Sequence, residues 1–100
     1  MMIVKGEARF ASGEIDRLRG PLNDWIKAAC GRHGCLSYSY AVDLADPNVL
    51  HVIETWQDEG AIDAHMADMG PLLEILAGAK MLSLRVDAFE ARFVKTLMGE

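Results

Sequence analysis

The fold is decided by four short stretches: Gly34-Cys35-Leu36-Ser37-Tyr38, Asp46-Pro47-Asn48, Glu54-Thr55-Trp56-Gln57-Asp58-Glu59 and Ala64-His65. The first and third predict two strands. The second predicts the turn between them, because proline fixes φ and Asp and Asn side chains bond the local backbone. The third also predicts that a helix begins just after the tryptophan, with the histidine on its apolar side. An indole, a carboxylate, phenols and an imidazole are therefore expected close together.

Upstream of these stretches, the pattern predicts one strand and one helix. Residues 2–10 alternate between apolar and charged side chains, which is typical of a strand with one buried face. Apolar residues then recur at helical spacing over residues 15–29. Ser12 is the expected N-cap of this helix. Gly20-Pro21 is expected to kink or restart it, because proline removes a backbone donor.

The central hairpin is expected to consist of strands over residues 35–43 and 49–56. Alternation predicts that four residues of the first strand lie on one of its faces: Leu36, Tyr38, Tyr40 and Val42. In the second strand, the residues that lie together on one face are Leu50, Val52, Glu54 and Trp56. The helix after this hairpin is expected to place Ile62, His65, Met66 and Met69 on one stripe.

The remaining chain predicts a short helix, a final strand and a tail. Gly70-Pro71 should end the preceding helix and begin a short one that closes at Gly78. Residues 81–90 form the fourth expected strand, and the last ten residues are expected to extend it or to form an arm onto a partner.

The resulting order, β-α-β-β-α-β, is the split βαβ arrangement of an α+β, ferredoxin-like fold, with an antiparallel sheet covered by helices on one face. We expect a single domain over residues 1–100. The other face of the sheet is expected to carry Ile3, Ile53, Met81 and Phe89. An uncovered apolar face predicts a homodimer in which two sheets pack together.

Composition narrows the class of function. The chain is 51% hydrophobic, with a formal net charge of -5 and a pI near 5.1, and its basic residues are scattered, so we expect no nucleic-acid partner. The N-terminus does not resemble a signal peptide, and no apolar run is long enough for a membrane helix. Cys30 and Cys35 lack metal-binding spacing, which predicts free thiols, a cytoplasmic location and no metal site.

The four opening stretches resemble the antibiotic biosynthesis monooxygenase family, the small dimeric α+β-barrel proteins that include quinol monooxygenases. This resemblance implies a monooxygenase that uses O2 without metal, flavin or other cofactor. Its substrate would be a small electron-rich aromatic such as a hydroquinone, phenol, naphthol or anthrone.

The resemblance also implies roles for individual side chains. His65 would be the catalytic base, or would orient one, with Glu54 holding its tautomer, while Trp56 flanks the substrate ring. Tyr38 and Tyr40 would position its oxygens, and Met66 would belong to the pocket wall.

The chain departs from individual branches of this family. The second histidine of the quinol-oxidising branch is replaced by Met69-Gly70-Pro71-Leu72, and Val52 stands where the polyketide-oxidising branch has asparagine. The first-strand asparagine of the haem-degrading branch is replaced within Gly6-Glu7-Ala8. The missing second histidine and asparagine motivate one alternative, a non-catalytic dimeric module that binds a small molecule. A haem-degrading enzyme is a further alternative, against which the missing first-strand asparagine counts.

Each candidate side chain also has a structural interpretation. His65 could be a core histidine, and Glu54 could be a structural partner of His65 or Arg85. Trp56 could be a packing anchor whose N–H finds a local acceptor. His51 is interpreted as a dimer-interface residue rather than a catalyst.

Overall fold

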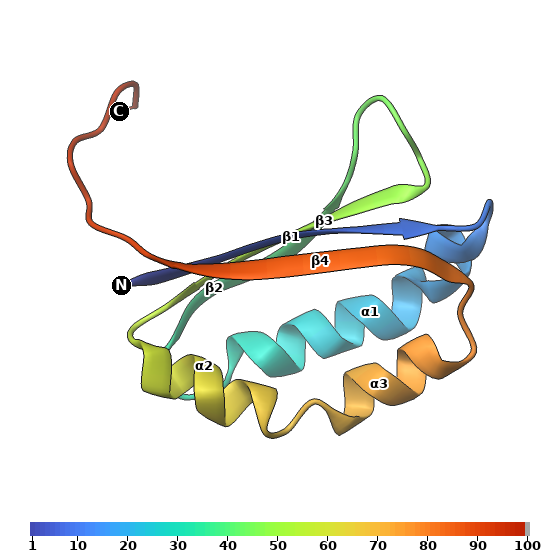
Figure 1. The fold of residues 1–100 in the computed structure, drawn as a ribbon, viewed down its shortest axis with the longest axis horizontal. Coiled ribbons are helices and arrows are strands. Elements are labelled where there is room, and N and C mark those ends of the chain that lie inside the picture. Colours follow the sequence, from blue (N-terminus) through green and yellow to red (C-terminus); the bar gives the residue numbers. More distant parts are fainter. Residues whose placement is uncertain (100) are drawn as a thin grey trace.

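The computed structural model describes residues 1–99 of the chain. Seven elements follow one another, as Figure 1 shows: β1 (Met2–Phe10), α1 (Glu14–Cys30), β2 (Cys35–Val42), β3 (Val49–Trp56), α2 (Glu59–Met66), α3 (Gly70–Ala77) and β4 (Met81–Glu90).

The four strands form one antiparallel sheet in the order β2-β3-β1-β4. All three helices lie on the same side of this sheet, and the opposite side carries none (Figure 1). The predicted α+β, ferredoxin-like fold is thus confirmed. The short helix expected to begin at Gly70-Pro71 is present as α3, and Gly78 is its C-cap.

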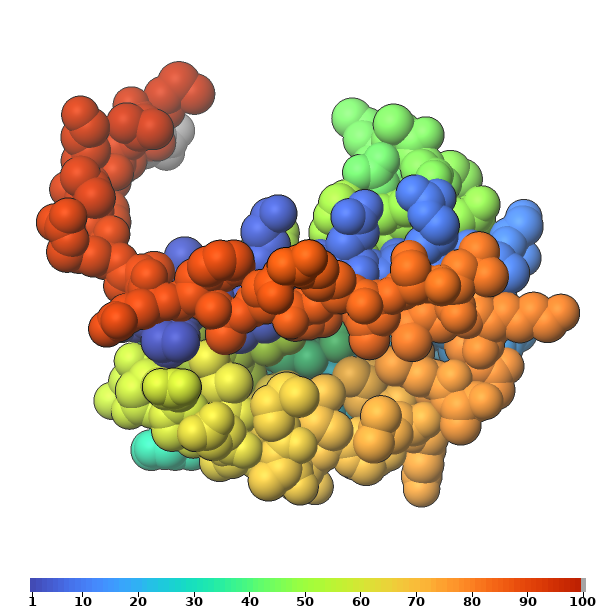
Figure 2. Space-filling view, in the orientation of Figure 1, coloured from blue at the N-terminus to red at the C-terminus, as the bar shows by residue number. Residues whose placement is uncertain are grey.

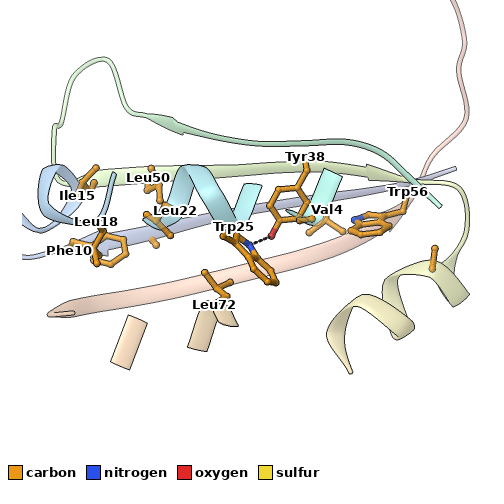
Figure 3. Close-up of a cluster of buried hydrophobic side chains, with 13 residues drawn as sticks. Val4, Phe10, Ile15, Leu18, Leu22, Trp25, Tyr38, Leu50, Trp56 and Leu72 are labelled. Carbon is orange, nitrogen blue, oxygen red and sulfur yellow. Dashed lines mark hydrogen bonds between the residues drawn. The ribbon is translucent and has the colours of Figure 1, made fainter. Parts of the chain in front are cut away.

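The core fills the space between the sheet and α1. Helical spacing puts five residues of α1 on its buried stripe, and alternate residues of the strands meet them. Figure 3 shows these side chains, among them Val4, Phe10, Ile15, Leu18, Leu22, Trp25, Tyr38, Leu50, Trp56 and Leu72. Phe10 and Trp56 are almost completely buried. The inward faces predicted for β1 and β3 are confirmed.

Two expectations about α1 were wrong. Its N-cap is Gly13, in the left-handed conformation, rather than Ser12, and no side chain caps this end. The helix also does not restart at Gly20-Pro21, because it continues from Glu14 to Cys30 with Pro21 inside it. An internal proline costs about 3 kcal/mol, whereas burying Leu18 and Leu22 on either side contributes roughly 1.5–3 kcal/mol each. Packing therefore outweighs the lost hydrogen bond.

A β-bulge changes the faces expected for the start of β2. Cys35 pairs with Trp56, whereas Ser37 pairs with Thr55, so Leu36 is an extra residue between them. Leu36 is consequently exposed, and Cys35 packs against the core in its place. Tyr38 and Tyr40 keep the predicted inward direction because they lie beyond the bulge.

The register of β4 corrects the expected composition of the outer sheet face. A second irregularity, between Arg9 and Phe10, pairs Met81 with the inward-facing Phe10. Met81 therefore belongs to the inner face, whereas Ile3 pairs with Phe89 on the outer one. Ile53 and Phe89 remain about half exposed there.

The chain leaves the sheet after β4. Residues 91–99 contain no regular helix or strand and curve away from the body of the molecule (Figure 1), so the expected strand extension was wrong. We call residues 91–99 the C-terminal arm. Its exposed apolar side chains are Phe93, Val94, Leu97 and Met98. Within residues 1–99, no helix has the length and apolar character needed to cross a membrane.

Candidate functional site

A cavity of about 490 Å³ lies between the inner face of the sheet and the helices α2 and α3. Its walls are mostly aliphatic, because the alternate residues of β1, β3 and β4 that face it are apolar. Figure 2 shows the molecule hollowed between β4 and the α2–α3 segment. β4 is exposed along most of its length, so the cavity opens beside this edge strand.

Five of the six predicted site residues line this cavity: Tyr38, Tyr40, Glu54, His65 and Met66. Three elements bring them together, since the tyrosines come from β2, the carboxylate from β3, and the histidine and methionine from α2. Met66 is 59% exposed and not part of a buried stripe as expected. It lies on the solvent side of the wall.

Trp56 is not among the described residues that line the cavity. It is completely buried, and its indole N–H donates to Glu54 at 2.9 Å. Its ring lies against the imidazole of His65, with centroids 4.7 Å apart. The sequence allows two interpretations of Trp56, a packing anchor or a ring that stacks on a ligand. The packing anchor fits this position, because the ring contacts Glu54 and His65 on their side away from the cavity.

Glu54 presents a carboxyl group to an apolar cavity. Burial raises the pKa of the Glu54 carboxyl above its ordinary value, while hydrogen bonds from Trp56 and Tyr38 lower it. The partners expected from sequence were wrong. Arg85 pairs with Asp87, and residues 1–99 provide no hydrogen bond between Glu54 and His65. Glu54 is therefore a buried carboxyl with a raised pKa at the wall of a cavity, which makes it a candidate proton-transfer group.

His65 is held by a residue that the sequence analysis did not select. Arg32 Nη1 lies 2.9 Å from His65 Nδ1 and donates to the His65 carbonyl oxygen at 3.2 Å. The guanidinium also pairs with Asp68 at 3.5 Å and stacks over the ring of Trp25 at 4.9 Å. Burial, followed by the charge of Arg32, lowers the pKa of His65, and Asp68 partly offsets this.

The phenols of Tyr38 and Tyr40 form a hydrogen-bonded pair, with their oxygens 2.9 Å apart. The indole N–H of Trp25 donates to both, at 2.9 Å and 3.1 Å. Burial raises the pKa of each phenol, so both remain neutral and able to donate. The helical spacing of α1 indicated that Trp25 is buried, but its contact with the tyrosines depends on the packing of α1 on β2.

The other histidines lie elsewhere. His51 pairs with Asp43 at 2.7 Å beside the β2–β3 turn, and His33 belongs to the segment between α1 and β2. Both cysteines are free thiols. Within residues 1–99, no three His, Cys, Asp or Glu side chains are grouped closely enough to hold a metal ion.

The cavity thus combines apolar walls with a buried carboxyl of raised pKa and hydrogen-bond donors. Such a site accepts a flat, largely apolar ligand that carries one or two oxygens. The carboxylate could remove a proton from that ligand, and the phenols and imidazole could bind its oxygens.

Solved structures share this fold. A protein from Deinococcus radiodurans, provisionally named an antibiotic biosynthesis monooxygenase, is 28% identical with a TM-score of 0.89 over 99% of this chain and 100% of its own. A conserved protein from Methanosarcina mazei Go1 is 17% identical, with a TM-score of 0.82 over 91% and 92% of the two chains. The latter shows likeness of fold alone. No curated protein matches the chain significantly.

The sequence itself carries the family signature. The model of the antibiotic biosynthesis monooxygenase family matches residues 1–68, which include β1, α1, the central hairpin and α2. The matched segment contains the carboxylate, the phenols and the imidazole of the cavity. The chain therefore belongs to the antibiotic biosynthesis monooxygenase family.

Proposed function

We propose that this protein is a monooxygenase that oxidises a small electron-rich aromatic, of the hydroquinone, phenol or anthrone type, with O2 and without a cofactor. The observation that carries the proposal is the cavity itself, in which the carboxyl group of Glu54 is buried among mostly apolar walls. Membership of the family supports the monooxygenase class.

The chemistry requires little more than a proton acceptor and a dry site. Removal of a proton converts the aromatic into an anion, which can transfer one electron to O2 directly. The radical pair then combines within the cavity. One oxygen atom enters the product and the other leaves as water, with all electrons supplied by the substrate. Apolar walls exclude bulk water from these intermediates.

The roles of the side chains follow from their positions. Tyr38 and Tyr40 would orient the substrate oxygens, and Met66 would close the wall next to solvent. Glu54 and His65 are the buried carboxyl and imidazole of the cavity wall, and groups of these two kinds can act as general acid, general base or hydrogen-bond donor. Trp56 would tune Glu54 through its indole N–H rather than stack on the substrate.

The proposal is tested by oxygen uptake with metal-stripped protein and a panel of hydroquinones, naphthols and anthrones. We expect uptake that falls at least about 100-fold in Glu54→Gln and in His65→Ala, since general acid–base groups typically contribute 10²–10⁴-fold. Arg19→Ala, an exposed site on α1, is the control. Saturable binding without oxygen uptake would instead favour a small-molecule-binding module, and haem turnover would favour a haem-degrading enzyme.

We further propose that the protein is a cytoplasmic homodimer. Ile53 and Phe89 on the outer sheet face are about half exposed, and the C-terminal arm exposes Phe93, Val94, Leu97 and Met98. A second copy that packs its sheet on this face would cover both. The free thiols of Cys30 and Cys35 fit a reducing compartment.

A further inference from the structure

The contact between Arg32 and His65 determines where the imidazole carries its proton. A guanidinium has five N–H donors, no acceptor, and does not lose a proton in proteins. At 2.9 Å from Arg32 Nη1, the Nδ1 atom of His65 must therefore be the acceptor. A neutral imidazole whose Nδ1 accepts carries its proton on Nε2.

The other two protonation states conflict with this geometry. A proton on Nδ1 would face the guanidinium donor, and an imidazolium would add a second positive charge beside Arg32. Asp68 and Glu54 are the acidic groups nearby. Asp68 already pairs with Arg32 at 3.5 Å, and Glu54 accepts from Trp56 on the cavity side. Neither carboxylate bonds His65 within residues 1–99.

The second observation is that His65 Nε2 has no hydrogen-bond partner among the described residues. His65 is 3% exposed and lines the cavity, whereas Arg32 lies outside it, next to Trp25. His65 contributes to the cavity wall, and Nε2 is the ring nitrogen that does not contact Arg32, so it is the polar atom of the ring that remains for a ligand. A buried donor left unsatisfied costs about 1–3 kcal/mol, which an acceptor atom of a ligand would remove.

We propose that His65 donates its Nε2–H to an acceptor oxygen of the ligand, and that Arg32 is the positioning residue that fixes this tautomer. The ligand class is then an aromatic with a keto or phenolate oxygen. In the oxidation, which rests on the proposed function, His65 stabilises the oxyanion of the substrate. It cannot take the substrate's proton, because Nε2 already carries one, so Glu54 is the base.

The tautomer is measured directly by ¹⁵N NMR of the imidazole. A His33→Gln/His51→Gln protein retains His65 alone. We expect an unprotonated Nδ1 and a protonated Nε2 throughout pH 6–8. In an added Arg32→Met change, which keeps an unbranched chain over Trp25, this single tautomer should give way to a mixture. Arg32→Lys, which also only donates, and Arg19→Met should retain it. A protonated Nδ1 or an imidazolium in the parent protein would overturn the proposal.

Ligand recognition is measured with 9-fluorenone and fluorene, which share a ring system and differ in the carbonyl oxygen. We expect fluorenone to bind about tenfold more tightly, because the carbonyl satisfies Nε2. His65→Phe should abolish this preference. His65→Gln, whose side-chain amide can donate from nearly the same place, should restore part of it. Equal affinity of the two ligands for the parent protein would contradict the proposal.

Neither measurement depends on turnover. A protein that shows the predicted tautomer and prefers fluorenone, yet consumes no oxygen with any substrate, would refute the monooxygenase proposal and leave His65 as the oxygen-binding donor. A protein that consumes oxygen but has Nδ1 of His65 protonated would refute the proposed tautomer and leave the monooxygenase proposal in place.

Discussion

The indole N–H of Trp56 donates to the carboxylate of Glu54 at 2.9 Å, although the two residues belong to the same strand, two positions apart. Both side chains point to the inner face of β3 because a strand alternates with period two. Trp56 is fully buried and Glu54 reaches the cavity. A packing residue thereby stabilises the charged form of the candidate base.

Replacing this indole should weaken both the fold and the base. We expect Trp56→Phe to lower the free energy of unfolding by about 2–4 kcal/mol, since it removes a hydrogen bond to a charged group and leaves a cavity. The pKa of Glu54 should rise further, because an acceptor interaction of its charged form is lost. Denaturant unfolding and ¹³C NMR titration of the carboxyl measure the two effects. In a Glu54→Gln background the stability loss should shrink; an unchanged loss would show that the hydrogen bond contributes nothing.

The free energy of unfolding should depend on pH through the protonation of Glu54. Its pKa in the folded state is raised above the unfolded value, so folding favours the protonated form. That contribution is fully present below the unfolded pKa and is lost as the pH rises through the folded pKa. Glu54→Gln should therefore gain stability relative to the parent as the pH rises from about 4, by at most about 1.4 kcal/mol per pH unit. A difference in unfolding free energy that is constant with pH, or of opposite sign, would contradict this assignment.

Gly34 should be intolerant of any side chain. Its φ is +79°, and a Cβ built there would lie 2.5 Å from the Cβ of Ala61 in α2. Gly34→Ala should therefore lower the free energy of unfolding by about 2–4 kcal/mol, combining left-handed strain with a steric clash. Gly13, with φ +82° and open space around it, is the matched control, and Gly13→Ala should cost about 1 kcal/mol. Equal losses for the two variants would mean that α2 moves aside freely.

The proposed dimer depends on the outer sheet face and on the C-terminal arm. Ile53→Glu, which puts a charge at the centre of that face, and a chain that ends at residue 90 should each shift the mass in analytical ultracentrifugation from two chains toward one. Leu44→Glu, at a fully exposed position of the β2–β3 turn, should leave it unchanged. A parent protein of single-chain mass at micromolar concentration would refute the dimer.

Most of the fold could be predicted from the sequence because it depends on short-range patterns. Period-two alternation located the inward faces of β1 and β3, and helical spacing located the buried stripe of α1. Gly70-Pro71 located the start of α3. The errors have a common cause. Pro21 stays within a helix, and Leu36 becomes the extra residue of a bulge, because packing and strand register outweigh local preference.

By itself, the sequence determined that a carboxylate, two phenols and an imidazole would face the same side of one sheet, since the direction of a side chain follows from its position in a strand or helix. Only the tertiary structure decided which of these groups touch. It placed Trp56 behind Glu54 rather than against a ligand, and it brought Arg32 from the segment after α1 to His65, 33 residues away. Contacts of this kind depend on how helices pack on the sheet, and periodicity along the chain carries no information about them.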